Sequence, residues 1–370
     1  MPFKSQAQPQ PETLTFAYVP RPGLLKITLI NLVFNVLTLS IYRFWGKTHV
    51  RRHIWSCIHV NGEPLEYTGR GMELFKGFLV VFGLILLPFV VLSAALHFAF
   101  GPESPAAGAV GAIFALFVYS MFGFAIYKAR RYQLTRTQWR GIRGDLAGSA
   151  LNYSLLYFGA WMAKVASLGW AMPVMNTVLQ EHITNDMRFG DAAFKFKGPA
   201  GPLYPAYALC WFLFLAVLLV SLFLVVALFM GAEEAVKATS SDATKAAMAI
   251  FIGIMIFLAF AFYIVVFPAI WSIYWATQMR SFAQYTRFDG AAFQFSATAL
   301  SLVWLVFANF LILLLTLGTF WPYVQQRNLR YFVGRLRLVG AIDVERIRQS
   351  SLTMPRRGEG LADAFDVSAW

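Results

Sequence analysis

Long apolar stretches dominate the pattern of hydrophobic and polar positions along the chain. Seven of them are long enough to enter a membrane, at about residues 24–45, 76–99, 108–127, 151–179, 206–230, 246–275 and 297–323. A membrane-spanning helix needs about 20 apolar residues, because every backbone amide in lipid must find its partner within its own segment. The pattern therefore predicts an all-α polytopic membrane protein with about seven membrane-embedded helices.

A shorter pattern with a period of two occurs between the apolar stretches. It is clearest from Arg287 to Phe295, where Phe293 and Phe295 fall on one face. Alternation of this kind is typical of a half-buried strand. We therefore expect short β-strands at the membrane interface.

The chain also repeats itself. The interval from Arg280 to Gly290 recurs from Arg330 to Gly340, and three further segments ending in glycine follow the same spacing, one of them beginning at Gln180. Self-similarity of this kind indicates duplication of a structural unit. Aligned on the glycines, the chain has three diverged repeat units, at about residues 16–62, 141–190 and 290–340.

Each unit has the same internal order. An apolar run is followed by a Gly/Pro/Trp break, a basic amphipathic stretch and an alternating segment. Leu37 to Trp45 matches the sequence 278 residues later, and Asn31 matches Asn309 at the same offset. Two apolar hairpins separate the units, at residues 76–127 and 206–275, and Pro, Gly and small polar residues mark their turns.

These patterns predict a single membrane domain over residues 12–345. Residues 1–11 are expected to be disordered, and residues 346–370 to form a polar C-terminal tail that is mobile from Ser350 onward. The first 20 residues lack the basic-then-apolar order of a signal peptide, so we expect insertion to begin with the first helix. The two cysteines, Cys57 and Cys210, offer no disulfide framework.

Composition agrees with a membrane location. Hydrophobic residues make up 58% of the chain and its mean hydropathy is +0.59, above the values of soluble domains. The net charge of +13 is compatible with nucleic-acid binding. However, Lys and Arg cluster at the ends of the apolar stretches, where the positive-inside rule places them. We therefore expect membrane lipids, anionic ones in particular, as partners and no nucleic acid.

Two membrane topologies compete. If all seven stretches cross, the cytoplasmic segments hold 22 Lys and Arg residues and the external segments hold 8. If the stretches within the repeat units instead dip in and return, one face holds 28 and the other holds 2. Charge bias and repeat symmetry favour the second topology. The length of the stretches favours seven crossings, which we take as the expectation because spanning is the commoner fate of such stretches.

Several motifs resemble one family of bacterial membrane proteins. ELFKGFLV at residues 73–80, LTLSIYRFWGKTHVRR at residues 37–52 and the RFDGAAFQF type of segment look like the YjgN family, also known as the DUF898 domain family. The resemblance covers about residues 12–345 and implies a multi-pass protein of the bacterial inner (plasma) membrane. It implies no activity, because the family has none established. The chain departs from the pattern at Glu181 and His182, which replace a basic pair.

Polar residues inside the apolar stretches are candidates for a transport path. Lys164 lies near the middle of its stretch, where an ionisable group is costly unless it faces water or a partner. Asn31, Asn35 and Asn309 add amides within the repeat units. Together they could line a path for a solute or a proton. Alternatively, the asparagines join helices by hydrogen bonding and Lys164 extends to the interface.

Basic residues next to aromatic ones are candidates for lipid binding. Cationic and amphipathic aromatic side chains together mark the headgroup zone and can hold anionic lipid. The simpler alternative is that these charges only set the topology. The candidate headgroup contacts are Arg51, Arg52, Arg130, Arg131, Arg327 and Arg330.

Enzymatic and metal chemistry have little support. His49, His53 and Cys57 would share one helix face and could bind zinc or copper. The matching positions of the third unit hold Arg, Tyr and Arg, so we expect no metal site and no cofactor. Nucleotide-binding, zinc-protease and serine-hydrolase motifs are absent from the sequence, and we expect no enzyme.

The functional expectation is passage of a small solute or lipid. Transporters commonly combine internal repeats with interrupted apolar segments that meet near the membrane midplane. The alternative is a protein that binds anionic lipid, or scaffolds the envelope, without transport. Oligomeric state does not follow from the sequence.

Overall fold

The computed structural model describes residues 13–101, 104–238 and 241–352, so the predictions for residues 1–11 and 353–370 lie outside the described residues. The chain forms two compact units. Unit 1 comprises the described residues of 1–199, 282–295 and 316–370, and unit 2 comprises those of 200–281 and 296–315.

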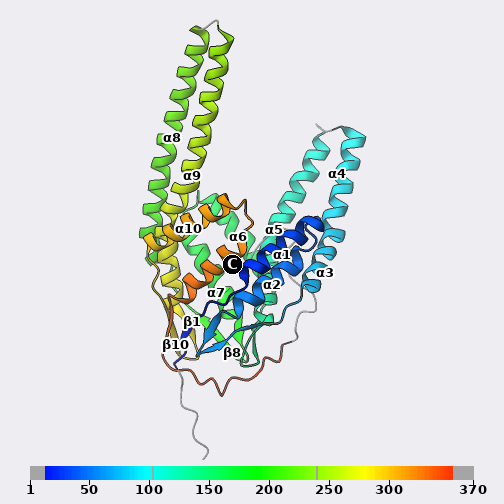
Figure 1. Ribbon diagram of the computed structural model, residues 1–370, viewed down its shortest axis with the longest axis vertical. Coiled ribbons are helices and arrows are strands. Elements are labelled where there is room, and N and C mark those ends of the chain that lie inside the picture. The colour runs from blue at the N-terminus through cyan, green and yellow to red at the C-terminus, as the bar shows by residue number, and fades with distance from the viewer. Residues whose placement is uncertain (1–12, 102–103, 239–240, 353–370) are drawn as a thin grey trace, which may run out of the picture. The chain divides into compact units, whose positions relative to one another are not determined.

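Among the described residues, four helical segments are long and apolar enough to cross a membrane. They are the continuous segment of α3 (Gly71–Val81), η1 (Phe82–Leu86) and α4 (Leu87–Phe100), then α5 (Pro105–Arg136), α8 (Tyr204–Ala238, preceded by the short helix η2, Gly201–Leu203) and α9 (Asp242–Tyr285). Each has at least 29 residues, more than the about 20 that a bilayer core requires. They correspond to the two predicted apolar hairpins (Figure 1).

The apolar stretches of the repeat units form pairs of shorter helices. The pairs are α1 (Leu24–Leu37) with α2 (Arg43–Trp55), α6 (Ala150–Ala166) with α7 (Met172–Asp186), and α10 (Ala299–Leu315) with α11 (Trp321–Val333). The 14 residues of α1 extend about 21 Å, which is less than the bilayer core. The expected seven crossings are therefore not confirmed.

A sharp turn separates the two helices of each pair, at the predicted Gly/Pro/Trp break. A leucine with a φ angle between 48° and 50° lies in each turn, namely Leu39, Leu168 and Leu317. In the first turn the amide of Ser40 donates to the carbonyl of Asn35 at 2.7 Å, and in the second the amide of Gly169 donates to the carbonyl of Lys164 at 2.7 Å. Hydrogen bonds of this span close the C-terminus of a helix.

Short antiparallel strands lie between the helical segments. They are β1 (Phe16–Tyr18), β2 (Ile58–Val60), β3 (Glu63–Pro64), β4 (Glu66–Tyr67), β5 (Thr137–Trp139), β6 (Ile142–Leu146), β7 (Met187–Phe189), β8 (Ala192–Phe196), β9 (Thr286–Phe288), β10 (Ala291–Phe295) and β11 (Leu336–Val339). Strands β4 to β11 form one sheet in which every strand pairs with its neighbours in sequence, and β1 to β3 form a second sheet.

The connections between the strands alternate in kind. Two-residue turns join β5 to β6, β7 to β8 and β9 to β10, whereas helices join β4 to β5, β6 to β7, β8 to β9 and β10 to β11. Successive connections in an antiparallel sheet lie at opposite ends of the strands. The chain therefore leaves for each helical connection from the same end of the sheet. The single strand expected at residues 287–295 is a hairpin, because Asp289 and Gly290 form its turn with positive φ angles.

Apolar side chains fill the space beside the strands. Val60, Trp139, Phe288 and Leu338, from four different strands, belong to one buried cluster. Phe194 stacks on Phe288 with 4.4 Å between ring centroids. The period-two pattern of the sequence therefore reflects burial of one strand face.

The C-terminal segment crosses the turns of the large sheet. The amide of Asp191 donates to the carbonyl of Arg348 at 2.9 Å, and the side chain of Gln349 donates to the carbonyl of Gly141 at 2.8 Å. Residues 346–352, the described part of the predicted polar tail, thus pair through their polar groups with backbone groups of the turns.

Small residues bring α5 and α6 of unit 1 together. A Cβ atom added at Gly123 would lie 2.8 Å from the Cα atom of Ser154, and the hydroxyl of Ser154 donates to the carbonyl of Ser120 at 2.6 Å. Close backbone approach at glycine and serine is how helices associate in membranes, where lipid removes the hydrophobic driving force.

In unit 2, aromatic side chains fill the contact between α8 and α9. Tyr207 packs against Trp271 and Tyr274 with ring centroids 5.5 and 5.3 Å apart. Cys210 is buried and its thiol donates to the carbonyl of Ile270 at 3.1 Å.

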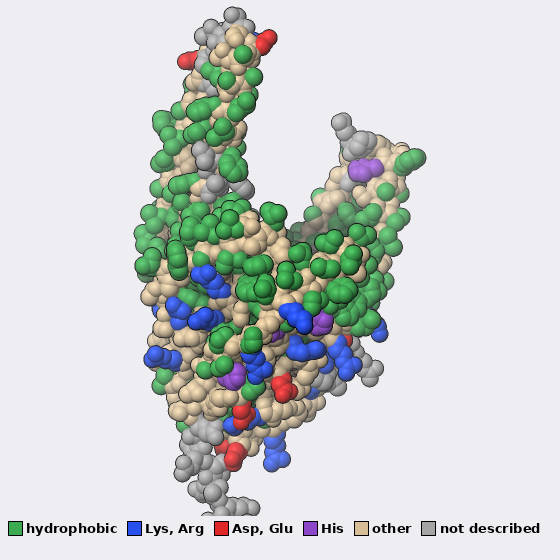
Figure 2. All heavy atoms as spheres, viewed as in Figure 1, with side chains coloured by type: hydrophobic (Ala, Val, Ile, Leu, Met, Phe, Trp, Pro, Cys, Tyr) green, Lys and Arg blue, Asp and Glu red, His purple; other side chains and the backbone are tan. Residues whose placement is uncertain are grey.

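Exposed hydrophobic side chains cover the long helices, as contact with lipid requires. Leu84 and Phe98 are 74% and 98% exposed in unit 1, and Phe223 is 72% exposed in unit 2. Figure 2 shows hydrophobic side chains along both long hairpins and most Lys and Arg side chains on the remaining surface. Patches of this size indicate a membrane environment.

Candidate functional site

The site begins with a polar face on the otherwise apolar helix α1. Thr28, Asn31 and Asn35 recur every three or four residues and therefore share one face. On the other side of α1, Val36 and Leu37 are about 70% exposed. Since α1 is amphipathic within an apolar sequence, its polar face needs a polar partner.

Helix α2 supplies a basic face. Arg43, Lys47 and Arg51 are spaced by four residues, so they follow one side of α2. Gly46 lies on the neighbouring face, and a Cβ atom added there would lie 3.2 Å from Cγ of Asn31. The glycine therefore allows the amide of α1 to lie against the backbone of α2.

A cavity of about 400 Å³ lies between α1, α2 and the start of α11, entirely within unit 1. This volume is in the range of small-molecule sites. Its lining residues are Thr28, Asn31, Leu32, Asn35, Arg43, Gly46, Lys47, Val50, Arg51, Gly318, Thr319, Trp321, Pro322 and Gln325.

Two buried amide oxygens in the cavity wall are unsatisfied by the protein. Asn31 is only 7% exposed, and its Nδ2 donates to the carbonyl of Gly46 at 3.4 Å. The Oδ1 atoms of Asn31 and Asn35 are both buried and accept no hydrogen bond from any described residue. A buried acceptor without a donor is costly, and these two oxygens are too deeply buried to be open to a ligand in the cavity.

The cavity is positively charged. Arg43, Lys47 and Arg51 line it, and the described residues around it include no carboxylate. Arg43 begins α2 and Trp321 begins α11, but their amides already donate within the preceding turns, to the carbonyls of Ser40 and Gly318. The capacity of the cavity to bind an anion therefore comes from its basic side chains.

Neighbouring groups hold two of the basic side chains in place. The guanidinium of Arg43 lies 5.0 and 5.3 Å from the ring centroids of Phe44 and Phe78. Nη1 of Arg51 donates to the hydroxyl of Tyr67 at 3.4 Å.

The cavity contains part of the predicted transport path. Asn31 and Asn35 line it, as does Arg51, which was assigned to lipid headgroups. Lys164 lies outside the lining, and its Nζ donates to Oδ1 of Asn176 at 2.8 Å. Asn309 is buried in unit 2.

The other predicted headgroup residues lie outside the cavity. Nη2 of Arg52 donates to the carbonyl of Gly69 at 3.3 Å. Arg130 is half-buried, and Nε of Arg131 lies 3.9 Å from a carboxylate oxygen of Asp145. On α11, Arg327 is half-buried and Arg330 is exposed.

Sequence reasoning did not select Arg43 and Lys47 as site residues. The available signal was their spacing of four with Arg51, opposite an amide face with the same helical period. The sequence alone does not show that Gly318 and Thr319 line the cavity, because this depends on contact between residues almost 300 positions apart.

The metal candidates do not form a site. Among the described residues, no group of three or more His, Cys, Asp and Glu side chains could hold a metal ion. Nδ1 of His49 lies 3.4 Å from the hydroxyl of Tyr42, and the thiol of Cys57 donates to the carbonyl of His53 at 3.3 Å. Burial lowers the pKa of both histidines, with Arg52 contributing for His49.

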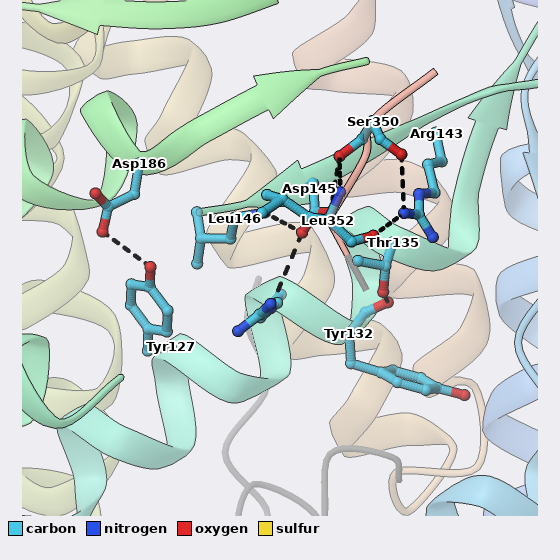
Figure 3. Close-up of polar contacts among 10 residues, drawn as sticks. Tyr127, Tyr132, Thr135, Arg143, Asp145, Leu146, Asp186, Ser350 and Leu352 are labelled. Atoms are coloured by element: carbon cyan, nitrogen blue, oxygen red, sulfur yellow. Dashed lines mark hydrogen bonds and ion pairs between the residues drawn. The ribbon is translucent and has the colours of Figure 1, made fainter. Parts of the chain in front are cut away.

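A second buried polar cluster lies beneath the C-terminal segment (Figure 3). Asp145 is fully buried; it accepts from the hydroxyl of Ser350 at 3.2 Å and from the amide of Leu146 at 2.7 Å. Arg143 donates to the carbonyls of Ser350 and Leu352. These hydrogen bonds hold the C-terminal segment against the sheet.

The four long helices and the cavity between shorter, interrupted helices define a polytopic helical membrane protein. A family model described as "Bacterial protein of unknown function (DUF898)" matches residues 21–364, and the chain belongs to this family, as its motifs predicted.

The chain is also similar to inner membrane protein YjgN of Salmonella typhimurium, with 30% identity over 118 residues. The match covers 31% of this chain and 27% of that protein, so it spans about a quarter of the relative's length. No solved structure matches the chain.

Proposed function

We propose that this protein resides in the bacterial inner membrane and passes a small anionic solute or lipid across it through the α1–α2–α11 cavity. The name of the YjgN relative supports the location. The observation that carries the function is the lining of one cavity by three basic side chains, with no carboxylate among its described lining residues. We propose that the cavity binds the solute or lipid and lets it pass, without a catalytic step.

The three helix pairs are proposed to be re-entrant and to derive from three diverged repeats. Strand pairing supports the re-entry, because Gly144 on β6 pairs with Phe189 on β7 and Ala292 on β10 pairs with Val339 on β11. Both ends of each intervening segment thus return to one sheet. Transporters use interrupted helices of this kind, with helix ends directed at the substrate.

A vesicle assay tests passage. Purified protein is reconstituted, and two probes are followed: translocation of a fluorescent phosphatidylglycerol, and efflux of inorganic phosphate. We expect the protein to accelerate at least one of them, and the double variant Lys47→Ala/Arg51→Ala to reduce that rate about tenfold or more, since each lost charge-assisted contact costs at least about 1.5 kcal/mol. Lys26→Ala is the control, because Lys26 is exposed on α1 outside the cavity.

Acceleration that persists in the double variant would exclude the cavity as the route. The second candidate function is binding of anionic lipid without passage. The observation in its favour is the length of α1, which covers only part of the bilayer depth. Binding to the wild-type protein without acceleration of either probe would select this second function.

A further inference from the structure

A second concave site lies on the large sheet and shares no residue with the α1–α2–α11 cavity. It has a volume of about 390 Å³ and lies entirely within unit 1. Strands β8 and β9, the turn before β10 and the C-terminal segment form it. Its charged lining residues are Lys195, Arg287, Asp289 and Arg346. We call this site the sheet groove.

Two cations of the sheet groove lie directly opposite each other. Lys195 on β8 pairs with Arg287 on β9 in the register of the sheet. Directly opposed residues point to the same face, with their Cβ atoms about 5 Å apart. Both side chains are exposed, and neither forms an ion pair or a side-chain hydrogen bond with any described residue. Like charges in direct opposition destabilise a sheet, so an anion bound between them would be stabilising.

The carboxylate of the sheet groove is already engaged. Asp289 forms an ion pair with Arg346 through Oδ1, and its Oδ2 accepts from the amide of Asp343 at 3.3 Å. The lining therefore has three basic side chains and one carboxylate, an excess of two positive charges. A ligand with two negative charges would balance this excess.

The rest of the lining consists of small residues. They are Ala192, Ala193 and Gly290, so the described lining offers no large apolar side chain against which an acyl chain could pack. Burial of apolar surface is what retains a lipid chain at a protein. The sheet groove therefore fits a soluble anion better than a lipid.

We propose that the sheet groove binds a soluble phosphate monoester, whose phosphate group bridges Lys195 and Arg287. A monoester carries about 1.5 to 2 negative charges at pH 7 and three strong acceptor oxygens, so it can accept from both side chains at once. Arginine binds phosphate through paired donors, and lysine binds it as a point charge. This site is additional to the passage proposed for the α1–α2–α11 cavity.

Calorimetric titration of the full chain in a neutral detergent tests this proposal with three probes. Methyl phosphate is a soluble monoester, dimethyl phosphate is a diester with one charge, and short-chain phosphatidic acid carries the monoester on a lipid. The wild-type chain and the Lys47→Ala/Arg51→Ala variant are both titrated, and binding to the sheet groove is the component that they share. In that component we expect methyl phosphate to bind about tenfold more tightly than dimethyl phosphate, and phosphatidic acid to bind no more tightly than methyl phosphate.

Variants connect this binding to the opposed pair. We expect Lys195→Ala/Arg287→Ala to weaken binding of methyl phosphate about tenfold or more, because two charge-assisted contacts are lost. Without ligand, its thermal midpoint is expected to equal or exceed that of the wild-type protein, because the opposed like charges are removed.

Arg188→Ala/Arg337→Ala is the matched control. It removes the same charge from exposed positions that lie outside the groove lining and pair with the neutral residues Ala193 and Gln294. We expect it to change the affinity for methyl phosphate by about twofold or less, since contact rather than overall charge sets the affinity.

Equal weakening by the two double variants would assign the effect to surface charge in general and overturn the site. Loss of methyl phosphate binding in Lys47→Ala/Arg51→Ala would also overturn it, and would leave the proposed function of the cavity in place. Equal binding of methyl and dimethyl phosphate would overturn the requirement for two charges, and tenfold tighter binding of phosphatidic acid would overturn the assignment to a soluble ligand.

Discussion

At the scale of residues, the basic face of α2 decides what the cavity can bind. Arg43, Lys47 and Arg51 occupy three successive turns, and the positions 278 residues later hold Trp, Gln and Leu. The three basic side chains are therefore specific to the first helix pair.

Gly46 is expected to control the position of the Asn31 amide. In Gly46→Ala the new Cβ atom would lie 3.2 Å from Cγ of Asn31 and displace it. We expect a lower thermal midpoint in detergent, because overpacking of this kind costs about 1 to 3 kcal/mol of folding stability. Thermal unfolding in detergent measures the change.

Gly159→Ala is the control for this substitution, because a Cβ atom there meets nothing within 4 Å. An unchanged thermal midpoint in Gly46→Ala would contradict close packing of the Asn31 amide against α2.

The histidines of α2 predict a dependence of stability on pH. Burial lowers the pKa of His49 and His53 below 6.5 in the folded state, so the unfolded chain binds more protons just below that pH. Stability from these groups is present above pH 6.5 and is lost as the pH falls through the folded pKa values. We expect the thermal midpoint to fall less between pH 7 and pH 5 in a His49→Gln/His53→Gln variant than in the wild-type protein. An identical fall in both proteins would assign the dependence to other groups.

At the scale of elements, the sequence predicted where the apolar segments lie and where they are interrupted. It was less informative about how many of them cross the membrane. An apolar stretch of about 27 residues is compatible with one helix or with two shorter ones. The deciding turns contain leucines in the left-handed region, which few L residues adopt. The strands were predicted, but their pairing depends on contacts between distant residues, and periodicity does not carry that information.

The site was predicted only in part for the same reason, namely that contacts between distant residues cannot be inferred from local sequence patterns. Asn31, Asn35 and Arg51 stood out as polar groups in or beside an apolar run, a signal visible along the chain. Their convergence with the start of α11 depends on helix packing. Lys164 gave an equally strong local signal, yet it lies outside the cavity and pairs with Asn176.

The packing of α5 on α6 is expected to depend on Gly123. In Gly123→Leu the side chain would overlap the Cα atom of Ser154 and the Cβ atom of Tyr157, at 2.8 and 2.6 Å. Overpacking of this kind costs about 1 to 3 kcal/mol, and more where a backbone must move. We expect a lower thermal midpoint in detergent and faster proteolysis.

The matched variant is Gly108→Leu, on the same helix, where an added Cβ atom meets nothing within 4 Å. Equal stability of Gly123→Leu and Gly108→Leu would contradict close packing of these helices.

At the scale of the whole molecule, one antiparallel sheet organises the helical segments. All helical connections of the large sheet leave from one end of its strands. With re-entrant helix pairs, the strand side holds 28 of the Lys and Arg residues and the opposite side holds 2, which predicts a cytoplasmic sheet.

The most direct test of this account is the sidedness of the strands. Single cysteines are placed at Arg140, Arg188 and Gln294, which lie in or beside β5, β7 and β10, and at Ser104 and Asp242 in the long hairpins. They are labelled with a membrane-impermeant maleimide in spheroplasts and in inverted vesicles of a cysteine-free background. We expect the three strand positions to react from the cytoplasmic face and the two hairpin positions from the opposite face. Reaction of Arg140→Cys from one face and of Arg188→Cys and Gln294→Cys from the other would contradict the account and restore seven crossings.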